Sequence, residues 1–274
     1  MLTRAVRGGL LFAGALALSA VTAAPVAAQT SVTVTGGLDF TNQYNFRGIR
    51  QNTDGVSVWP YVDLGIGVKE GVTLNFGTWN AFNSQINEDD FGTGNKWYES
   101  DLYATLGFGF TGGAVGITYT SYTSPADLFS HVKEIAFKVT GDDSAALGAA
   151  SMKPYALVAF ELSDDGQADA GASKGTYLEL GVAPGIAGSK ASLAIPIKVG
   201  LSLSDYYEFG TGEDSTFGYF SVAGVVTVPF NSNWNLHGGV EFQTFGDNLK
   251  SYNGFGDDGD GPATIASVGV GFTF

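Results

Sequence analysis

The sequence contains no cysteine, so disulfide bonds cannot stabilise the fold. Basic residues are also scarce: 13 Lys and Arg stand against 27 Asp and Glu, which gives a net charge of −14 at pH 7. A nucleic-acid partner is not expected, because phosphate binding requires clustered Lys and Arg. The chain beyond its N-terminal segment also lacks a run of about 18 apolar residues, the length that a membrane-spanning helix needs. Any membrane residence must therefore use strands.

The N-terminal segment has the composition of a secretory signal. Arg4 and Arg7 give it a charged start, residues 9–21 form an apolar stretch, and Val26-Ala27-Ala28 resembles a small-residue cleavage site. Removal of the two arginines changes the net charge from −14 to −16. We expect a signal peptide over residues 1–28 and a single domain over residues 29–274, in an exported protein.

Apolar and polar residues alternate with period two along most of the remaining chain. Counting such segments between Gly, Asn, Asp, Ser or Pro gives about twelve strands, most of them near the 9 to 11 residues that a tilted strand needs to cross a bilayer. The predicted strands are Val32 to Thr41, Val56 to Val68, Val72 to Asn80, Trp97 to Phe110, Ala114 to Tyr122, Val132 to Val139, Pro154 to Leu162, Thr176 to Ile186, Leu193 to Leu203, Phe217 to Val228, Trp234 to Phe245 and Ile265 to Phe274.

The connections between these strands alternate between tight turns and long polar loops. This regularity is typical of an up-and-down barrel with an even number of strands and both termini at the short-turn end. One segment, residues 141–153, is as long as a loop but falls where a short turn is expected. Because strand boundaries carry an uncertainty of about 2 to 4 residues, ten or fourteen strands remain possible.

One face of each predicted strand is as apolar as a protein core. A soluble exported sandwich or barrel would also alternate, but its strands would present charged faces to water. In hydrocarbon, an open sheet edge would leave unpaired backbone groups that cost several kcal/mol each, so the sheet must close. The prediction is an all-β, twelve-stranded, antiparallel transmembrane barrel in the bacterial outer membrane.

The last strand ends the chain on aromatic residues. Phe272 and Phe274 share the apolar face, while Gly269, Gly271 and Thr273 lie on the other. This ending resembles the closing strand by which Gram-negative barrels are recognised for assembly. The resemblance implies that Phe272 and Phe274 are an assembly signal and that the barrel-assembly machinery is a partner.

The same alternation assigns charged and polar residues to the lumen. Acidic residues outnumber basic ones there, so an open pore is expected to prefer cations or neutral solutes over anions. Twelve strands should leave a narrow pore or a plugged lumen. The candidate pore-lining residues are Asp39, Arg47, Asp63, Glu99, Asp101, Tyr103, Glu134, Lys138, Glu179, Lys198, His237 and Glu241.

Two features of this lumen have alternative interpretations. If the first strand continues past Thr41, Arg47 faces the carboxylates across the pore mouth and sets a transverse field; alternatively, Arg47 pairs with lumen acids and holds the first loop in place. Inward aromatic residues, Trp59 and Tyr61 among them, either form a stacking track for solutes or fill the lumen.

The stretch from Tyr44 to Gln51 resembles the start of the TorF-type porin family of proteobacteria. Members of that family carry a tyrosine, an aromatic-Arg-Gly-Ile core and a Gln just after the first strand, here Tyr44, residues 46–49 and Gln51. Arg50 departs from the small polar residue that the family often has at that position. The resemblance implies an outer-membrane, porin-like protein.

The functional prediction is passive diffusion of small neutral or cationic solutes, without cofactor or metal. The acidic loop clusters lack the spacing of a calcium loop. Two alternatives remain: a plugged barrel whose outer loops bind a partner or lipopolysaccharide, and a lipid-modifying enzyme. Enzymes of that kind need Ser and His side by side on the lipid-facing wall, and the two histidines, His131 and His237, are expected in a loop and in the lumen. No catalytic residue is predicted, and the expected surroundings are outer-membrane lipids and lipopolysaccharide.

Overall fold

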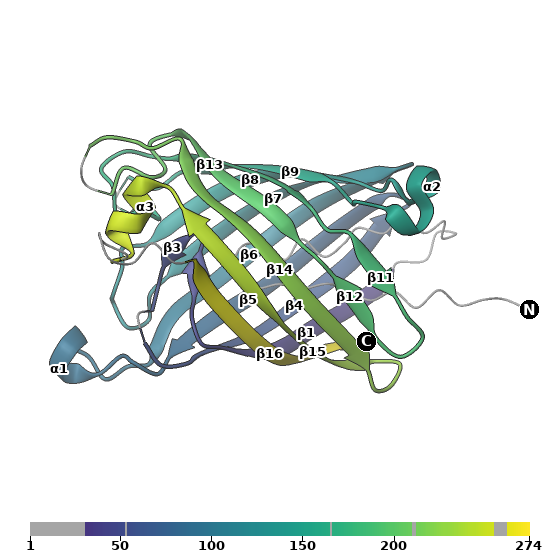
Figure 1. Ribbon diagram of the computed structural model, residues 1–274, viewed down its shortest axis with the longest axis horizontal. Helices are drawn as coiled ribbons and strands as arrows, with labels where there is room; N and C mark the ends of the chain where they lie inside the picture. Colours follow the sequence, from purple (N-terminus) through teal and green to yellow (C-terminus); the bar gives the residue numbers. More distant parts are fainter. Residues whose placement is uncertain (1–30, 53, 165, 210–211, 255–261) are drawn as a thin grey trace, which may run out of the picture.

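A computed structural model describes residues 31–254 and 262–274, apart from residues 53, 165, 210 and 211. The described chain forms an all-β barrel of twelve antiparallel strands that closes through the pairing of its first and last strands (Figure 1). The predicted signal peptide, residues 1–28, lies outside the described residues, as does the acidic run at residues 257–260. In the described part of the chain, every helix is too short or too polar to cross a membrane.

Ten of the barrel strands are continuous, and each matches a predicted strand. Trp97 to Phe110 and Trp234 to Phe245 match residue for residue. The continuous strands are β1 (Val32–Thr41), β4 (Ser57–Lys69), β5 (Val72–Asn83), β6 (Trp97–Phe110), β7 (Gly113–Thr123), β8 (Val132–Gly141), β9 (Tyr155–Glu161), β14 (Phe217–Pro229), β15 (Trp234–Phe245) and β16 (Ala263–Thr273).

The other two barrel strands are each interrupted at a proline. β10 (Thr176–Val182) is continued by β11 (Gly185–Ala187), and β12 (Ser192–Ala194) is continued by β13 (Ile197–Ser204). Pro184 and Pro196 lie in the two gaps, where proline cannot donate a ladder hydrogen bond. The sequence prediction of two unbroken strands over residues 176–186 and 193–203 was wrong on this point.

The two ends of the barrel differ as the loop lengths predict. The C-terminus, α2 (Ser144–Leu147) and β11 lie at the short-turn end, whereas α1 (Glu88–Phe91) and α3 (Asp247–Tyr252) lie at the long-loop end (Figure 1). The long connection at residues 141–153 contains α2 and the 3-10 turn η1 (Gly148–Ala150). Asp143 closes it by accepting hydrogen bonds from Ser151 Oγ at 2.5 Å and Met152 N at 3.0 Å. These hydrogen bonds lower the pKa of the Asp143 carboxyl, and the bond from Ser151 has the largest effect.

The outer surface of the barrel wall is apolar. Large side chains on the predicted outward faces are exposed, with Leu102 at 64%, Phe110 at 50% and Phe137 at 43%. A soluble protein rarely exposes so continuous an apolar surface, whereas a lipid-facing wall requires one. The inward faces carry the buried polar and charged residues. The core of this molecule is thus its lumen.

The first long loop folds back into the barrel. Its strands β2 (Asn45–Phe46) and β3 (Ile49–Arg50) form a hairpin whose two turn residues, Arg47 and Gly48, have φ of 50° and 84°. Two consecutive left-handed residues are the mark of the tight turn that joins twisted strands, and glycine adopts this conformation without strain. We call residues 42–52 the plug. Tyr44 and Ile49 are 1% exposed, so the plug excludes water from the long-loop end of the lumen.

Candidate functional site: the lumen and its plug

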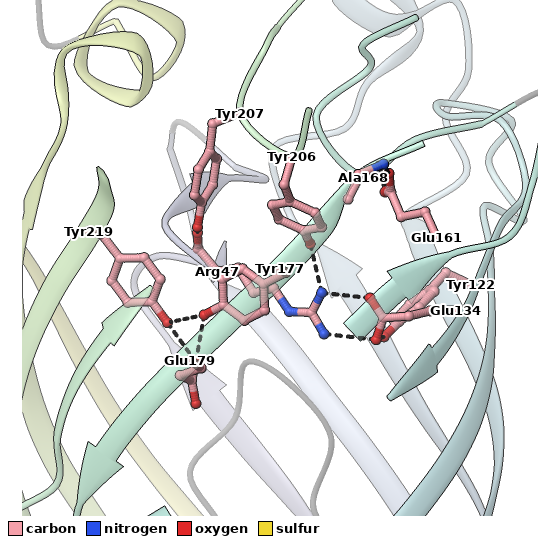
Figure 2. Close-up of polar contacts among 11 residues, drawn as sticks. Arg47, Tyr122, Glu134, Glu161, Ala168, Tyr177, Glu179, Tyr206, Tyr207 and Tyr219 are labelled. Atoms are coloured by element: carbon pink, nitrogen blue, oxygen red, sulfur yellow. Dashed lines mark hydrogen bonds and ion pairs between the residues drawn. The ribbon is translucent and has the colours of Figure 1, made fainter. Parts of the chain in front are cut away.

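Arg47 fixes the tip of the plug to the barrel wall. Its two terminal nitrogens bind both carboxylate oxygens of Glu134, at 2.5 and 2.8 Å, and one of them also donates to Tyr206 Oη at 2.8 Å (Figure 2). The guanidinium carbon lies 4.2 Å from the ring centroid of Tyr177. The two ionised side chains are almost fully buried, at 0% and 2% exposure. A bidentate salt bridge of this kind is strong and directional.

Further hydrogen bonds hold the plug at other points around the lumen. Tyr44 Oη donates to Glu99 Oε2 at 2.8 Å, and Asn45 Nδ2 donates to Gln243 Oε1 at 2.9 Å. From the long-loop end, Tyr207 Oη donates to the Arg47 carbonyl at 3.0 Å, and Asn253 Nδ2 donates to the Gly48 carbonyl at 2.8 Å. The plug is therefore secured by separate non-covalent contacts to strands and loops.

The position of Arg47 decides between the two sequence interpretations. β1 ends at Thr41, so Arg47 does not continue the inward parity of that strand but lies at the tip of the hairpin. It is buried against Glu134 rather than facing carboxylates across an open constriction. The transverse-field hypothesis was wrong for this arrangement, and the ion-pair alternative describes it.

Glu179 is the centre of a second polar cluster in the lumen wall. Its carboxylate accepts hydrogen bonds from the hydroxyls of Tyr177 at 2.7 Å and Tyr219 at 2.9 Å (Figure 2). The Tyr155 hydroxyl donates a third, at 2.7 Å. Lys138 Nζ lies 4.5 Å from the ring centroid of Tyr155. Three hydroxyl donors thus satisfy the hydrogen-bonding capacity of this buried carboxylate.

Tyrosines of the lumen wall lie over glycines of the neighbouring strands. Tyr103 is paired with Gly77, and a Cβ added to Gly77 would lie 2.2 Å from the Tyr103 ring. Tyr155 stands in the same relation to Gly181, with a corresponding distance of 2.5 Å. Because glycine has no side chain, the ring can lie flat against the wall instead of projecting across the lumen. Tyr61 with Gly37 and Tyr219 with Gly200 repeat the arrangement.

A third cluster lies where the plug meets β1, β13 and β15. Asp39 Oδ1 is 2.6 Å from His237 Nε2, and Lys198 Nζ is 3.4 Å from Glu241 Oε1. Glu241 Oε1 also accepts a hydrogen bond from Gln243 Nε2 at 3.0 Å. The sequence showed no carboxylate near His237 along its own strand; the partner comes from a strand 198 residues away in the chain.

The remaining predicted lumen acids are also buried on the inner wall. Asp63 accepts a hydrogen bond from Asn75 Nδ2 at 3.0 Å, and Asp101 lies on β6 with Glu99. Acidic side chains outnumber basic ones on the described inner wall. The structure thus brings most of the predicted residues into the three clusters around Arg47, Glu179 and Asp39. Asp63, Tyr103, Glu99 and Asp101 lie on the wall outside them, and Glu99 binds Tyr44 of the plug.

The two C-terminal phenylalanines lie at the short-turn end with Trp234. The ring centroids of Phe272 and Trp234 are 5.2 Å apart, and those of Phe272 and Phe274 are 5.7 Å apart. The Phe274 backbone pairs with Val34 of β1, at 2.9 and 3.0 Å. The terminal residue thereby helps to join the last strand to the first.

Sequence reasoning missed a serine–histidine contact on the outer wall. Ser121 Oγ, on β7, lies 2.7 Å from His131 Nε2. His131 directly precedes β8 and lies in the loop, as the sequence predicted, so the contact joins a strand residue to a loop residue. Among the described residues, no third side chain hydrogen-bonds to His131, whereas a nucleophile–base pair is ordinarily oriented by such a group.

Two long loops, residues 163–175 and 205–216, are also fastened to each other. Asp169 accepts hydrogen bonds from the backbone nitrogens of Glu208 at 2.8 Å and Phe209 at 3.1 Å, and Glu208 Oε1 accepts one from Ser173 N at 2.6 Å. Burial raises the pKa of Asp169 although these donors act to lower it. The hydrogen bonds between these two loops position Tyr206 and Tyr207 over the plug. No local sequence signal indicated this arrangement.

Comparisons with known proteins give structural matches only. No protein-family model matches the chain, and no curated protein sequence matches it. An outer-membrane channel from Pseudomonas putida superposes with a TM-score of 0.50 at 12% identity, over 94% of this chain and 100% of that one. The NanC porin superposes at 0.47 and 10% identity, over 89% and 99% of the two chains. Phospholipase A from the Escherichia coli outer membrane superposes at 0.45 and 12%, over 87% and 92%. By its fold, the chain belongs with the outer-membrane β-barrels.

Proposed function

We propose that the protein is an outer-membrane channel for small neutral or cationic solutes, closed in this structure by its plug. The observation that carries the proposal is the contrast between the two ends of the lumen. The plug, covered by Tyr206 and Tyr207, closes the long-loop end, whereas the rest of the wall carries charged residues and has tyrosines lying flat on glycines. A barrel with a purely structural role gains nothing from a charged inner wall, because unpaired buried charge is costly.

The acidic excess of the lumen supports the solute class. Asp39, Asp63 and Glu241 carry negative charge on the inner wall, and Lys138 and Lys198 supply the positive charge of the barrel strands there. Rings of acidic side chains favour cations, and neutral solutes pass without an electrostatic barrier. Anions should be excluded.

The plug contacts also support membership of the TorF-type porin family. The residues that carry the resemblance are those that hold the plug: Tyr44 binds Glu99, Arg47 binds Glu134, and Gly48 takes the left-handed turn position. Gln51 accepts a hydrogen bond from Tyr98 Oη at 2.5 Å. The motif would then be the signature of a loop that closes the barrel.

The second candidate is a plugged barrel with a structural or surface-binding role, for which the depth of burial of the plug is the supporting observation. Its long loops would bind a partner or lipopolysaccharide. Under either function we propose no bond-making chemistry. The route to the membrane, by a cleaved signal peptide and the barrel-assembly machinery acting on Phe272 and Phe274, is part of the same proposal.

Swelling of liposomes that contain the refolded protein distinguishes the two candidates. We expect slow uptake of small neutral and cationic solutes by the wild type, faster uptake when residues 43–51 are replaced by a short Gly-Ser linker, and no uptake of anions of equal size. If neither protein admits any solute, the plugged structural barrel is the correct reading. If anions enter as fast as cations, the assignment of an acidic, selective lumen is wrong.

A further inference from the structure

A small cavity lies where the plug meets the barrel wall. Asn45 reaches it from the plug, and Asp39, Lys198, Glu241 and Gln243 reach it from three strands of the wall, together with His237. Asp39 and Glu241 are each 5% exposed and Gln243 is 2% exposed, so these groups are almost fully removed from bulk water. Charged groups held in this way are built into the wall rather than displayed on a surface.

The cavity has acceptor capacity that the protein itself does not use. Asp39 binds His237 through Oδ1 alone, and Glu241 Oε1 receives both Gln243 Nε2 and Lys198 Nζ. Within the described part of the chain, no protein group donates a hydrogen bond to Asp39 Oδ2 or Glu241 Oε2. A carboxylate oxygen accepts about two hydrogen bonds, so both oxygens can receive a ligand that donates.

Lys198 shows which donor suits this site. Its ammonium lies 3.4 Å from Glu241 Oε1, a long contact for a charge-assisted hydrogen bond, and its side chain is 16% exposed. The Lys198 ammonium thus lies beside carboxylates whose negative charge a single cation does not balance. A free ammonium has three N–H donors and no acceptor, which complements the two carboxylate oxygens.

The same surroundings do not suit a sugar ring. Trp59, the aromatic residue of the cavity, is 4% exposed, and its ring is packed by Tyr44 at 5.3 Å and Trp79 at 5.6 Å between centroids. The ring is therefore covered by its neighbours and is not exposed to the cavity as an open platform. A stacking platform, the usual contact for a sugar, is missing, whereas the polar groups remain.

We infer that this cavity binds the primary ammonium group of a small organic amine, with Asp39 and Glu241 as its acceptors. The inference rests on the proposed function and names the solute class that the lumen selects. Lys198 competes with the solute for Glu241. The ammonium of the solute completes the charge balance of the cavity, and its organic part is not specified by the contacts.

Calorimetric titration of the refolded full barrel in detergent with n-butylammonium chloride tests the inference, with n-butanol as the uncharged probe. We expect heat of binding from the ammonium and none from the alcohol. Asp39→Asn and Glu241→Gln should each weaken binding by about tenfold or more, the effect of losing one charged acceptor at roughly 1.4 kcal/mol per tenfold. Lys198→Met should strengthen binding, because it removes the internal competitor.

Asp63→Asn is the matched control, since Asp63 is a buried aspartate of the inner wall that does not line the cavity. Retained heat-modifiable migration on gels verifies that each variant is folded. Equal heats for butylammonium and butanol, or equal weakening by Asp39→Asn and Asp63→Asn, would overturn the inference. Binding can be titrated without transport, so the two proposals fail separately. Binding without solute uptake would contradict the channel and support the amine site, whereas uptake without binding would contradict the amine site and support the channel.

Discussion

The ion pair between Arg47 and Glu134 gives the sharpest quantitative prediction. Glu134→Gln keeps the size of the side chain but leaves the Arg47 guanidinium, which is fully buried in the lumen, with neutral acceptors alone: the new amide oxygen and the Tyr206 hydroxyl. Removing one member of a buried ion pair costs about 3 to 5 kcal/mol, because the other charge is left uncompensated. Here the strain can be relieved without unfolding the barrel, since the plug can leave the lumen and return Arg47 to water.

The substitution should therefore shift the equilibrium of the plug rather than the stability of the strands. At about 1.4 kcal/mol per power of ten, a cost of 3 to 5 kcal/mol raises the ratio of open to closed plug by roughly two to four orders of magnitude. Single-channel recording in planar bilayers measures this ratio as open probability. Asp63→Asn, which removes a buried carboxylate that binds Asn75 on the barrel wall, is the control and should leave open probability unchanged.

A double-mutant cycle tests whether the ion pair is what holds the plug in the lumen. Replacing both partners, Arg47→Met with Glu134→Gln, removes the uncompensated charge and should open the channel less than Glu134→Gln alone. If the effects of the two substitutions simply add, or if Glu134→Gln lowers thermal stability without changing open probability, the ion pair is not what holds the plug.

Three further predictions concern other parts of the barrel. Gly77→Ala should displace the Tyr103 ring into the lumen and reduce conductance, and Tyr103→Ala in the same chain should restore it. A fluorophosphonate probe should leave Ser121 unlabelled, and added phospholipid should not be hydrolysed; labelling that His131→Ala abolishes would establish a nucleophile. Because the pKa of Asp143 is lowered in the folded state, its contribution to stability is present above the ordinary value of about 3.9 and is lost as the pH falls through the lowered value. Asp143→Asn should remove this acid-dependent step from melting curves, and an unchanged profile would contradict the assignment.

Much of the fold was predictable because lipid and lumen impose a strict alternation on each strand. Trp97 to Phe110 shows why: every second residue from Leu102 to Phe110 is apolar, and a slip of one position would turn Glu99 and Asp101 into the lipid. The breaks at Pro184 and Pro196 were missed although proline itself is the signal, because the apolar pattern continues through both positions.

The plug was not predictable as a closed structure. The hairpin signal is present, since apolar Phe46 and Ile49 flank Arg47-Gly48, but its destination depends on distant residues. Glu134 is 87 residues from Arg47, and Gln243 is 198 residues from Asn45. Parity shows that a side chain points into the lumen; it does not show which strand or loop meets it there.

The central claim is that a removable loop closes an otherwise passable, acidic lumen. Recording the reversal potential in a potassium chloride gradient, for the wild type and for the protein with residues 43–51 replaced by a Gly-Ser linker, tests it most directly. We expect brief, rare openings in the wild type and a sustained, cation-selective current without the plug. A silent membrane in the absence of the plug, or a reversal potential of the sign for chloride, would contradict it.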